Sequence, residues 1–254
     1  MRAVFMAKNK RSAARALDWL ATRCDVAAVV AAEPDAFTRD AQRLDLVAQR
    51  HGLLIVSEAE LYAHPPEEVD LVISFLFWKL IREPLISLGG IGCLNLHPAP
   101  LPDFRGVGGL NLAVLDGLRE WGVSCHWVDE RFDIGDLVEV ERFPIDPDTA
   151  TAFSLDLESQ DHLLALFQRV LGRALDGDEL PREPQGEGRY VTREELEALR
   201  VVRPGDDLDR KLRAFWYPPW PGALVQVEGR MLTLVDERLL AETAAAYRDA
   251  GLLP

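Results

Sequence analysis

The chain has 254 residues, which is enough for one large domain with a hydrophobic core or for a domain with a small appendage. A formal net charge of -14 argues against nonspecific binding to nucleic acid. No apolar run approaches the roughly 18 to 20 residues of a membrane-spanning helix. The composition therefore predicts a soluble globular protein without nucleic-acid or membrane partners.

Three cysteines, Cys24, Cys93 and Cys125, are an odd number and show no Cys-x-x-Cys spacing. This pattern predicts a reducing compartment, here the cytoplasm, and no structural zinc. Cys93 and Cys125 lie in apolar strand patterns, so we expect both to pack in the core. We expect no metal site.

Apolar runs and amphipathic segments alternate along the first part of the chain. The patterns predict strands at residues 2–7, 26–31, 53–56 and 69–75 and helices at 11–22 and 35–51, the last ended by Gly52. This βαβα order is typical of an α/β fold with a doubly wound, mostly parallel sheet of the Rossmann-like kind. Lys8-Asn9-Lys10 stands where a Gly-x-Gly-x-x-Gly turn would follow the first strand, so a dinucleotide site is not supported.

Asn95 and His97 lie on a predicted strand that follows a glycine turn at residues 90–92. Side chains alternate along a strand, so these two point to the same face, and Pro98 then ends the ladder. Open α/β sheets bind ligands at such strand ends. Taken alone, the pair is more simply a capped strand end with a satisfied histidine.

The later elements are predicted from the same signals. A helix is expected at 109–118, a strand at 122–129, a loop at 129–133, a strand at 137–143, a helix at about 150–176 capped by Asp148-Thr149, and a linker at 177–188. Beyond it we expect a capping box at 192–195, a helix at 208–215, a β-hairpin at 223–227 and 231–235, and a helix at about 241–250 ending at Gly251. These form a small C-terminal α+β appendage.

Several motifs occur in a fixed order between residues 95 and 135. They are Asn95-x-His97-Pro98-x-x-Leu101-Pro102, Arg105-Gly106, Gly122-Val-Ser-x-His126 and Asp133-x-Gly135. Together they resemble the folate-dependent formyltransferase family, whose members move a formyl group from N10-formyltetrahydrofolate to an amine. The resemblance covers residues 1–180 and implies a catalytic domain there, with a small C-terminal domain at 189–254.

The resemblance implies that Asn95, His97 and Asp133 are catalytic. Asn95 would donate an N–H to the oxygen that becomes negative, and His97 would donate as well or accept the proton leaving the amine. Asp133 would orient His97 and hold a water that relays protons. Asp136 is a rival for Asp133, but the family varies in residue type at that position. His126 is predicted to be a structural, hydrogen-bonding histidine.

The segment after the fourth predicted strand corresponds to one wall of the family's pterin pocket. The resemblance therefore implies that Phe77, Trp78, Lys79 and Ile81 bind the cofactor, N10-formyltetrahydrofolate, together with Asp129 on the loop that carries Asp133. The simpler alternative is that these aromatic side chains pack in the hydrophobic core.

The acceptor amine is predicted from looser signals. The segment 213–223 resembles the corresponding segment of sugar N-formyltransferases, so Trp216 and Tyr217 are substrate-binding candidates. Lys8, Lys10 and Arg105 could meet the diphosphate of a nucleotide-linked amino sugar. Their simpler interpretation is as solvated or turn charges. Aromatic side chains of this kind also pack domain junctions and dimer interfaces, so a homodimer is one expected assembly.

Two other functions stay open. One is formyl transfer to methionyl-tRNA or to a free or carrier-bound amino acid, although residues 190–254 hold nine Lys/Arg against eleven Asp/Glu and so show no basic face for RNA. The other is a catalytically silent folate- or nucleotide-binding relative, against which the intact set of Asn95, His97 and Asp133 argues.

Overall fold

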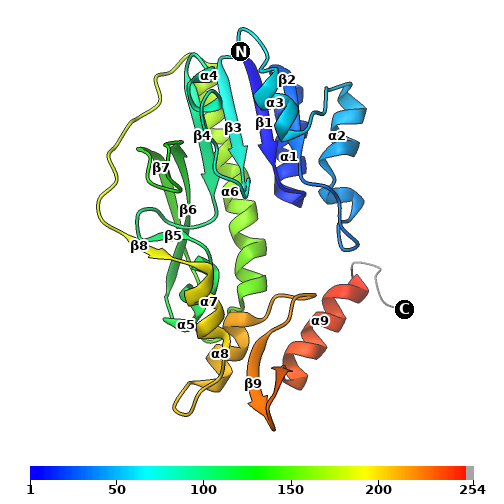
Figure 1. Ribbon diagram of the computed structural model, residues 1–254, viewed down its shortest axis with the longest axis vertical. Helices are drawn as coiled ribbons and strands as arrows, with labels where there is room; N and C mark the ends of the chain where they lie inside the picture. The colour runs from blue at the N-terminus through cyan, green and yellow to red at the C-terminus, as the bar shows by residue number, and fades with distance from the viewer. Residues whose placement is uncertain (250–254) are drawn as a thin grey trace. The chain divides into compact units, whose positions relative to one another are not determined.

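A six-stranded sheet in the order β2-β1-β3-β4-β6-β7 is the centre of the computed structural model, which describes residues 1–249 (Figure 1). The strands are β1 (Arg2–Ala7), β2 (Asp25–Ala31), β3 (Leu71–Phe75), β4 (Gly92–His97), β6 (Glu120–Trp127) and β7 (Leu137–Pro144). β1 pairs in parallel with β2 and β3, β3 pairs in parallel with β4, and β4 pairs antiparallel with β6. The predicted α/β fold with a mostly parallel sheet is confirmed.

The remaining elements include the predicted helices and hairpin, and also elements that the sequence patterns did not predict. The helices are α1 (Arg11–Ala21), the 3-10 helix η1 (Asp40–Gln42), α2 (Leu44–His51), α3 (Glu58–Ala63), α4 (Leu85–Leu88), α5 (Gly109–Leu115), α6 (Ala152–Leu175), α7 (Arg193–Arg200), α8 (Leu208–Phe215) and α9 (Glu237–Asp249). Two small sheets pair β5 (Phe104–Gly106) with β8 (Arg189–Val191) and β9 (Ala223–Val227) with β10 (Arg230–Leu234). The elements that were not predicted are η1, α3, α4, β5 and β8. Within residues 1–249, no helix is both long and apolar enough to cross a membrane.

The chain forms two compact units, each built from separate segments. The first comprises Met1–Arg105, Gly122–Arg142 and Ser159–Arg189, and the second comprises Gly106–Trp121, Phe143–Glu158 and Tyr190–Pro254. The functional division into residues 1–180 and 189–254 stays a prediction.

Alternating side chains of the central strands fill two cores on opposite faces of the sheet. On one face, Phe5 and Phe75 contact Phe167 of α6 at ring-centroid distances of 6.3 and 5.6 Å, and Trp19 of α1 contacts the same ring at 5.7 Å. On the other face, a cluster that includes Val4, Met6 and Cys93 packs against α3 and α4. Burial of both faces keeps the strand ends fixed in position.

Several predicted elements differ from the structure. Residues 53–56 are not a strand and form only a single bridge, between Val29 and Ile55. Leu54 and Ile55 are 61% and 42% exposed, so pairing of this segment buries little apolar surface and gains little stability. The helix predicted from residue 35 starts at Leu44, since the Asp35 carboxylate accepts hydrogen bonds from the Phe37 N–H and the Thr38 hydroxyl and closes a turn.

The third difference concerns the start of α6. Asp148-Thr149 was the predicted cap, but the Thr151 hydroxyl accepts from the Ser154 N–H at 3.0 Å, and the Ser154 hydroxyl oxygen accepts from the Thr151 N–H at 3.0 Å. α9 begins at Glu237, earlier than predicted, and its predicted end at Gly251 lies outside the described residues.

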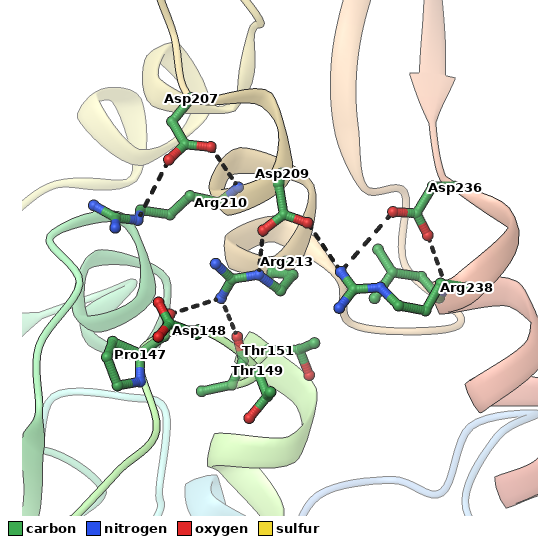
Figure 2. A network of polar contacts seen from close by, with 12 residues as sticks. Pro147, Asp148, Thr149, Thr151, Asp207, Asp209, Arg210, Arg213, Asp236 and Arg238 are labelled. Carbon is green, nitrogen blue, oxygen red and sulfur yellow. Dashed lines mark hydrogen bonds and ion pairs between the residues drawn. The ribbon is translucent and has the colours of Figure 1, made fainter.

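In the second unit, a buried arginine fastens α8 to its neighbours. Arg213 is 3% exposed, and its guanidinium donates to Asp209 at 2.8 Å and to the carbonyl oxygens of Pro147 and Ala150 at 3.1 and 2.8 Å (Figure 2). Asp209 also accepts from Arg238 of α9 at 3.0 Å. A buried charge needs such partners, and removing them would leave the Arg213 charge unpaired in the interior.

Candidate active site

Three neighbouring strands of the main sheet bring two polar side chains against the predicted catalytic residue Asn95. Ser74 on β3 lies beside Asn95 on β4, and Asn95 lies directly opposite His126 on the antiparallel strand β6. Directly opposed residues on an antiparallel pair project their side chains from the same face of the sheet. All three belong to the first unit.

The side-chain amide of Asn95 is held on both of its polar atoms. The Ser74 hydroxyl donates to Asn95 Oδ1 at 2.6 Å, and Asn95 Nδ2 lies 2.9 Å from His126 Nε2. Ser74 and His126 are 3% and 2% exposed. Hydrogen bonds between such buried groups hold a side chain in one geometry.

His126 is a neutral imidazole. Its Nδ1 lies 2.8 Å from the Trp127 carbonyl oxygen, and because a carbonyl can only accept, Nδ1 carries the proton. Burial disfavours the charged ring and, with the nearby His97, outweighs the attraction of Asp133, so the pKa of His126 falls to about 4. At neutral pH, His126 Nε2 is therefore an acceptor.

Asp133 faces both histidines from the loop between β6 and β7. Its Oδ1 lies 3.4 Å from His97 Nδ1 and 3.8 Å from His126 Nε2. The residue is 8% exposed and has a φ of 57°, a left-handed conformation that aspartate tolerates better than most residues. The carboxylate favours the His97 tautomer with a proton on Nδ1, which leaves His97 Nε2 as a proton acceptor. Asp136, the rival, contributes its backbone carbonyl to the Trp127 N–H.

The Asp133 loop is held by backbone and side-chain contacts on both sides. A Cβ at Gly135 would lie 1.9 Å from the Trp127 carbonyl oxygen, so only glycine fits there. Gln185 donates to the Gly135 carbonyl at 2.6 Å and accepts from Arg105 at 2.9 Å. The segment predicted as a linker thus contacts the loop that carries Asp133.

A serine from the Gly-Val-Ser-x-His motif fixes the loop that follows His97. Ser124 lies opposite His97 in the strand register, accepts from the Leu101 N–H at 2.9 Å and donates to the Ala99 carbonyl at 2.7 Å. The Asn-x-His-Pro and Gly-Val-Ser-x-His motifs are therefore joined by direct hydrogen bonds.

The residues predicted to bind the pterin occupy different environments. Trp78 is 41% exposed, and Lys79 forms an ion pair with Glu58 with its Nζ 5.8 Å from the Trp78 ring centroid. Ile81, by contrast, is 4% exposed in the core cluster, against which Phe77 also packs. Asp129 is exposed, and its carboxylate accepts from the Glu130 N–H at 2.6 Å. Their contact with a cofactor stays a prediction.

The residues predicted to bind the acceptor fall into two groups. Lys8 is exposed directly after β1, and Lys10 precedes α1, at the same sheet edge as Asn95. The Arg105 guanidinium also donates to the Gly186 carbonyl at 2.8 Å. Trp216 and Tyr217 lie in the second unit, where the Tyr217 hydroxyl donates to Asp156 at 2.5 Å and its ring contacts Phe153.

Sequence reasoning missed Ser74 and Gln185, and it gave His126 no contact with Asn95. The Gly-Val-Ser-x-His motif indicates that His126 belongs to the set of residues shared with the family. The contact itself depends on β6 running antiparallel to β4, which the βαβα pattern does not predict. Gln185 lies in a stretch rich in proline, glycine and charge, where no sequence pattern distinguishes it.

The arrangement suits acyl-type transfer without a protein nucleophile. Asn95 keeps one N–H that neither Ser74 nor His126 uses, and this donor can stabilise an oxygen on which negative charge develops. His97 can accept a proton at Nε2 while Asp133 stabilises the resulting charge. Within residues 1–249, no group of three or more His, Cys, Asp or Glu is placed to hold a metal ion.

Comparison with known proteins finds formyltransferases among the relatives of this chain. The chain is 33% identical over 166 residues to a GDP-perosamine N-formyltransferase of Brucella melitensis, covering 64% of this chain and 62% of that one. It is 31% identical over 193 residues to a methionyl-tRNA formyltransferase of Nitrosococcus oceani, covering 75% and 58%. The alignments thus span less than two thirds of either relative's length.

The fold matches solved structures across nearly the whole chain. The crystal structure of HypX from Aquifex aeolicus in complex with tetrahydrofolic acid superposes with a TM-score of 0.66 at 26% identity, over 93% of this chain and 37% of that one. The model of the formyl transferase family matches residues 4–171, the part of the chain that carries Asn95, His97 and Asp133. The chain therefore belongs to the formyl transferase family.

Proposed function

We propose that this protein transfers a formyl group from N10-formyltetrahydrofolate to the primary amine of an amino sugar carried on a nucleotide diphosphate. The observation that carries the proposal is the Asn95, His97 and Asp133 set, with His97 Nδ1 3.4 Å from Asp133 Oδ1 and the Asn95 amide fixed beside them. Similarity to a GDP-perosamine N-formyltransferase supports a sugar acceptor.

The residues at the sheet edge fit a folate formyl donor. Trp78, which follows β3, and Phe132, which directly precedes Asp133, are each 41% exposed and offer flat apolar surface. The HypX structure, solved with tetrahydrofolic acid, supports folate binding by this fold. When bound, N10-formyltetrahydrofolate supplies the formyl group, and Phe77, Trp78, Lys79, Ile81 and Asp129 are the residues proposed to hold it.

The chain's own residues perform the remaining chemistry. Asn95 donates its second N–H to the oxygen of the reacting group, and one such donor is typically worth about 3 kcal/mol of activation free energy. His97 Nε2 takes the proton released by the amine, and Asp133 holds the His97 ring and stabilises its charged form. Lys8, Lys10 and Arg105 are proposed to meet the diphosphate, and Trp216 and Tyr217 the rest of the acceptor.

A substrate panel tests the proposal. The protein is incubated with N10-formyltetrahydrofolate and amino sugars linked to dTDP, UDP and GDP, and in parallel with methionyl-tRNA, amino acids and aminoacyl carrier protein. We expect formylation of at least one sugar nucleotide and a higher melting temperature with 5-formyl folate, because a ligand that binds the native state stabilises it. Formylation of methionyl-tRNA alone would contradict the sugar acceptor and leave formyl transfer standing.

We also propose a cytoplasmic homodimer. All three cysteines are free thiols, as expected in a reducing compartment.

The dimer is proposed from exposed apolar side chains on the β9-β10 hairpin. Val227 and Leu232 share one face of this hairpin and are 45% and 42% exposed. Leu232→Lys should convert a dimer to a monomer in light scattering, whereas Leu157→Lys, at a residue 51% exposed on α6, should not. A monomeric wild-type protein would contradict this assembly.

A further inference from the structure

We infer that Ser74 and His126 are positioning residues that hold the Asn95 amide in one orientation, with its oxygen toward Ser74 and one N–H left for the substrate. The inference rests on the proposed function, since Asn95 acts on the reacting oxygen only in that reaction. It follows from which atoms can donate and which can accept.

The Trp127 carbonyl determines which nitrogen of His126 carries the proton. That oxygen can only accept, so His126 Nδ1, 2.8 Å away, must donate. In the neutral ring, His126 Nε2 then has a lone pair and no proton. The atom of Asn95 that lies 2.9 Å from His126 Nε2 must therefore be the amide nitrogen.

Ser74 fixes the other end of the amide. Its hydroxyl lies 2.6 Å from Asn95 Oδ1 and donates to it. Flipping the Asn95 amide would place its oxygen against the His126 Nε2 lone pair, which is repulsive. The His126 Nε2 lone pair thus selects this orientation. The Ser74 hydroxyl, which could also accept, donates to the oxygen that this orientation turns toward it, and one of the two Asn95 N–H groups remains for a ligand.

Burial keeps His126 neutral, although the nearby Asp133 carboxylate favours the charged ring. Asp133 Oδ1 lies 3.8 Å from His126 Nε2, the His97 ring centroid lies 6.5 Å from that of His126, and Arg105 acts from further away. Because the ring is 2% exposed, desolvation decides the balance against a proton. A second proton on His126 would replace the acceptor with a donor and turn the Asn95 amide around.

Two substitutions at position 126 separate this role from a structural one. The carboxamide of His126→Gln reaches the place of Nε2 and can accept from Asn95, but it loses the Trp127 contact. The carboxamide of His126→Asn reaches the place of Nδ1 and keeps the Trp127 contact, but it loses Asn95. We expect kcat to fall about 10-fold or more in His126→Asn and no more than about 3-fold in His126→Gln, with the KM for folate little changed.

Ser74→Ala has a matched control elsewhere in the same unit. Ser12 is also 3% exposed, and its hydroxyl also donates to a side-chain amide oxygen, that of Gln160 at 3.2 Å. Ser74→Ala should lower kcat about 10-fold, and Ser12→Ala should leave it unchanged. Thermal unfolding of each variant verifies that the protein is folded. If the His126 variants do not fold, the comparison of Ser74→Ala with Ser12→Ala tests the inference on its own.

The nitrogen NMR signals of labelled histidine test the orientation without turnover. We expect His126 to show a protonated Nδ1 and an unprotonated Nε2 at neutral pH. A proton on Nε2, or full kcat in His126→Asn with a large loss in His126→Gln, would overturn the inference. A wild-type protein that formylates no amine but has the expected tautomer would instead overturn the proposed function.

Discussion

Asn95 and His126 face each other across the antiparallel pair β4 and β6, with Asn95 Nδ2 2.9 Å from His126 Nε2. Through this contact a residue at the end of the parallel part of the sheet is held by a strand that runs the other way. The Asn95 amide is therefore oriented by the sheet itself rather than by a loop. Sites held by regular elements keep their geometry more precisely than sites built on loops alone.

Removing any one of the three side chains proposed to be catalytic should abolish most of the activity. We expect Asn95→Ala to lower kcat about 100- to 1,000-fold, since it removes the donor to the developing negative charge. His97→Ala and Asp133→Ala should have large effects of their own, but the triple variant should lose far less than the product of the three. Steady-state kinetics measures this. Strict multiplication of the losses would mean that the three side chains act independently.

Arg105 separates acceptor binding from loop support. Its guanidinium contacts Gln185 and Gly186, and its charge is proposed to meet the diphosphate. Arg105→Ala should raise the KM for a sugar nucleotide about 10-fold, because the lost contacts to the diphosphate serve ground-state binding, and should lower kcat less, because the contacts to Gln185 and Gly186 are also lost. Arg105→Lys keeps the positive charge but loses the paired N–H donors of the guanidinium. Its KM for the sugar nucleotide should lie between the values of the wild-type protein and Arg105→Ala. Equal defects in both variants, confined to kcat, would assign Arg105 to the loop alone.

Gly135 should not tolerate a side chain. A Cβ there would lie 1.9 Å from the Trp127 carbonyl, which also accepts from His126. Gly135→Ala should displace the Asp133 loop and lower kcat about 10-fold or more. Gly172→Ala is the matched control, since nothing lies within 4 Å of a Cβ at that position in α6. Kinetics and melting temperatures of the two variants test this, and an unchanged kcat in Gly135→Ala would show that the loop is not constrained.

Acid should destabilise the protein through His126. When unfolded, this histidine binds a proton as the pH falls below its ordinary pKa of 6.5, but when folded it stays neutral down to about 4. The unfolded state binds more protons in that window, so the free energy of unfolding decreases from pH 6.5 toward pH 4. Urea unfolding at several pH values should show a shallower decrease in His126→Gln than in wild type or in a variant of the exposed His64. Parallel curves would contradict the assignment.

Phe167 should carry much of the stability of one core. Its ring contacts Phe5, Phe75 and Trp19 and is fully buried. Phe167→Ala should lower the free energy of unfolding by about 3 to 5 kcal/mol, because it leaves a cavity. Phe37→Ala, at a residue 53% exposed, should change it little. Urea titration of both variants measures the difference, and equal effects would contradict this core.

The sequence predicted the parallel part of the sheet well because burial on both faces leaves an unbroken apolar run, as in β1 and β3. It failed at residues 53–56, where an apolar run lies exposed and pairs at a single bridge. The Asn95–His97 pair could be placed at a strand end from alternation alone. The partners of Asn95 could not, because strand order and direction bring Ser74 and His126 together from 21 and 31 residues away.

Direct transfer of a labelled formyl group tests the central claim most directly. N10-formyltetrahydrofolate with a 13C-labelled formyl carbon is mixed with the protein and a sugar nucleotide whose amine is 15N-labelled, and the product is followed by NMR. We predict a new bond between the labelled carbon and the labelled nitrogen with the wild-type protein. With Asn95→Ala, we predict that the rate of transfer falls by about 100-fold or more. Absence of the labelled bond with every amine tested, or an equal rate in Asn95→Ala, would contradict the account.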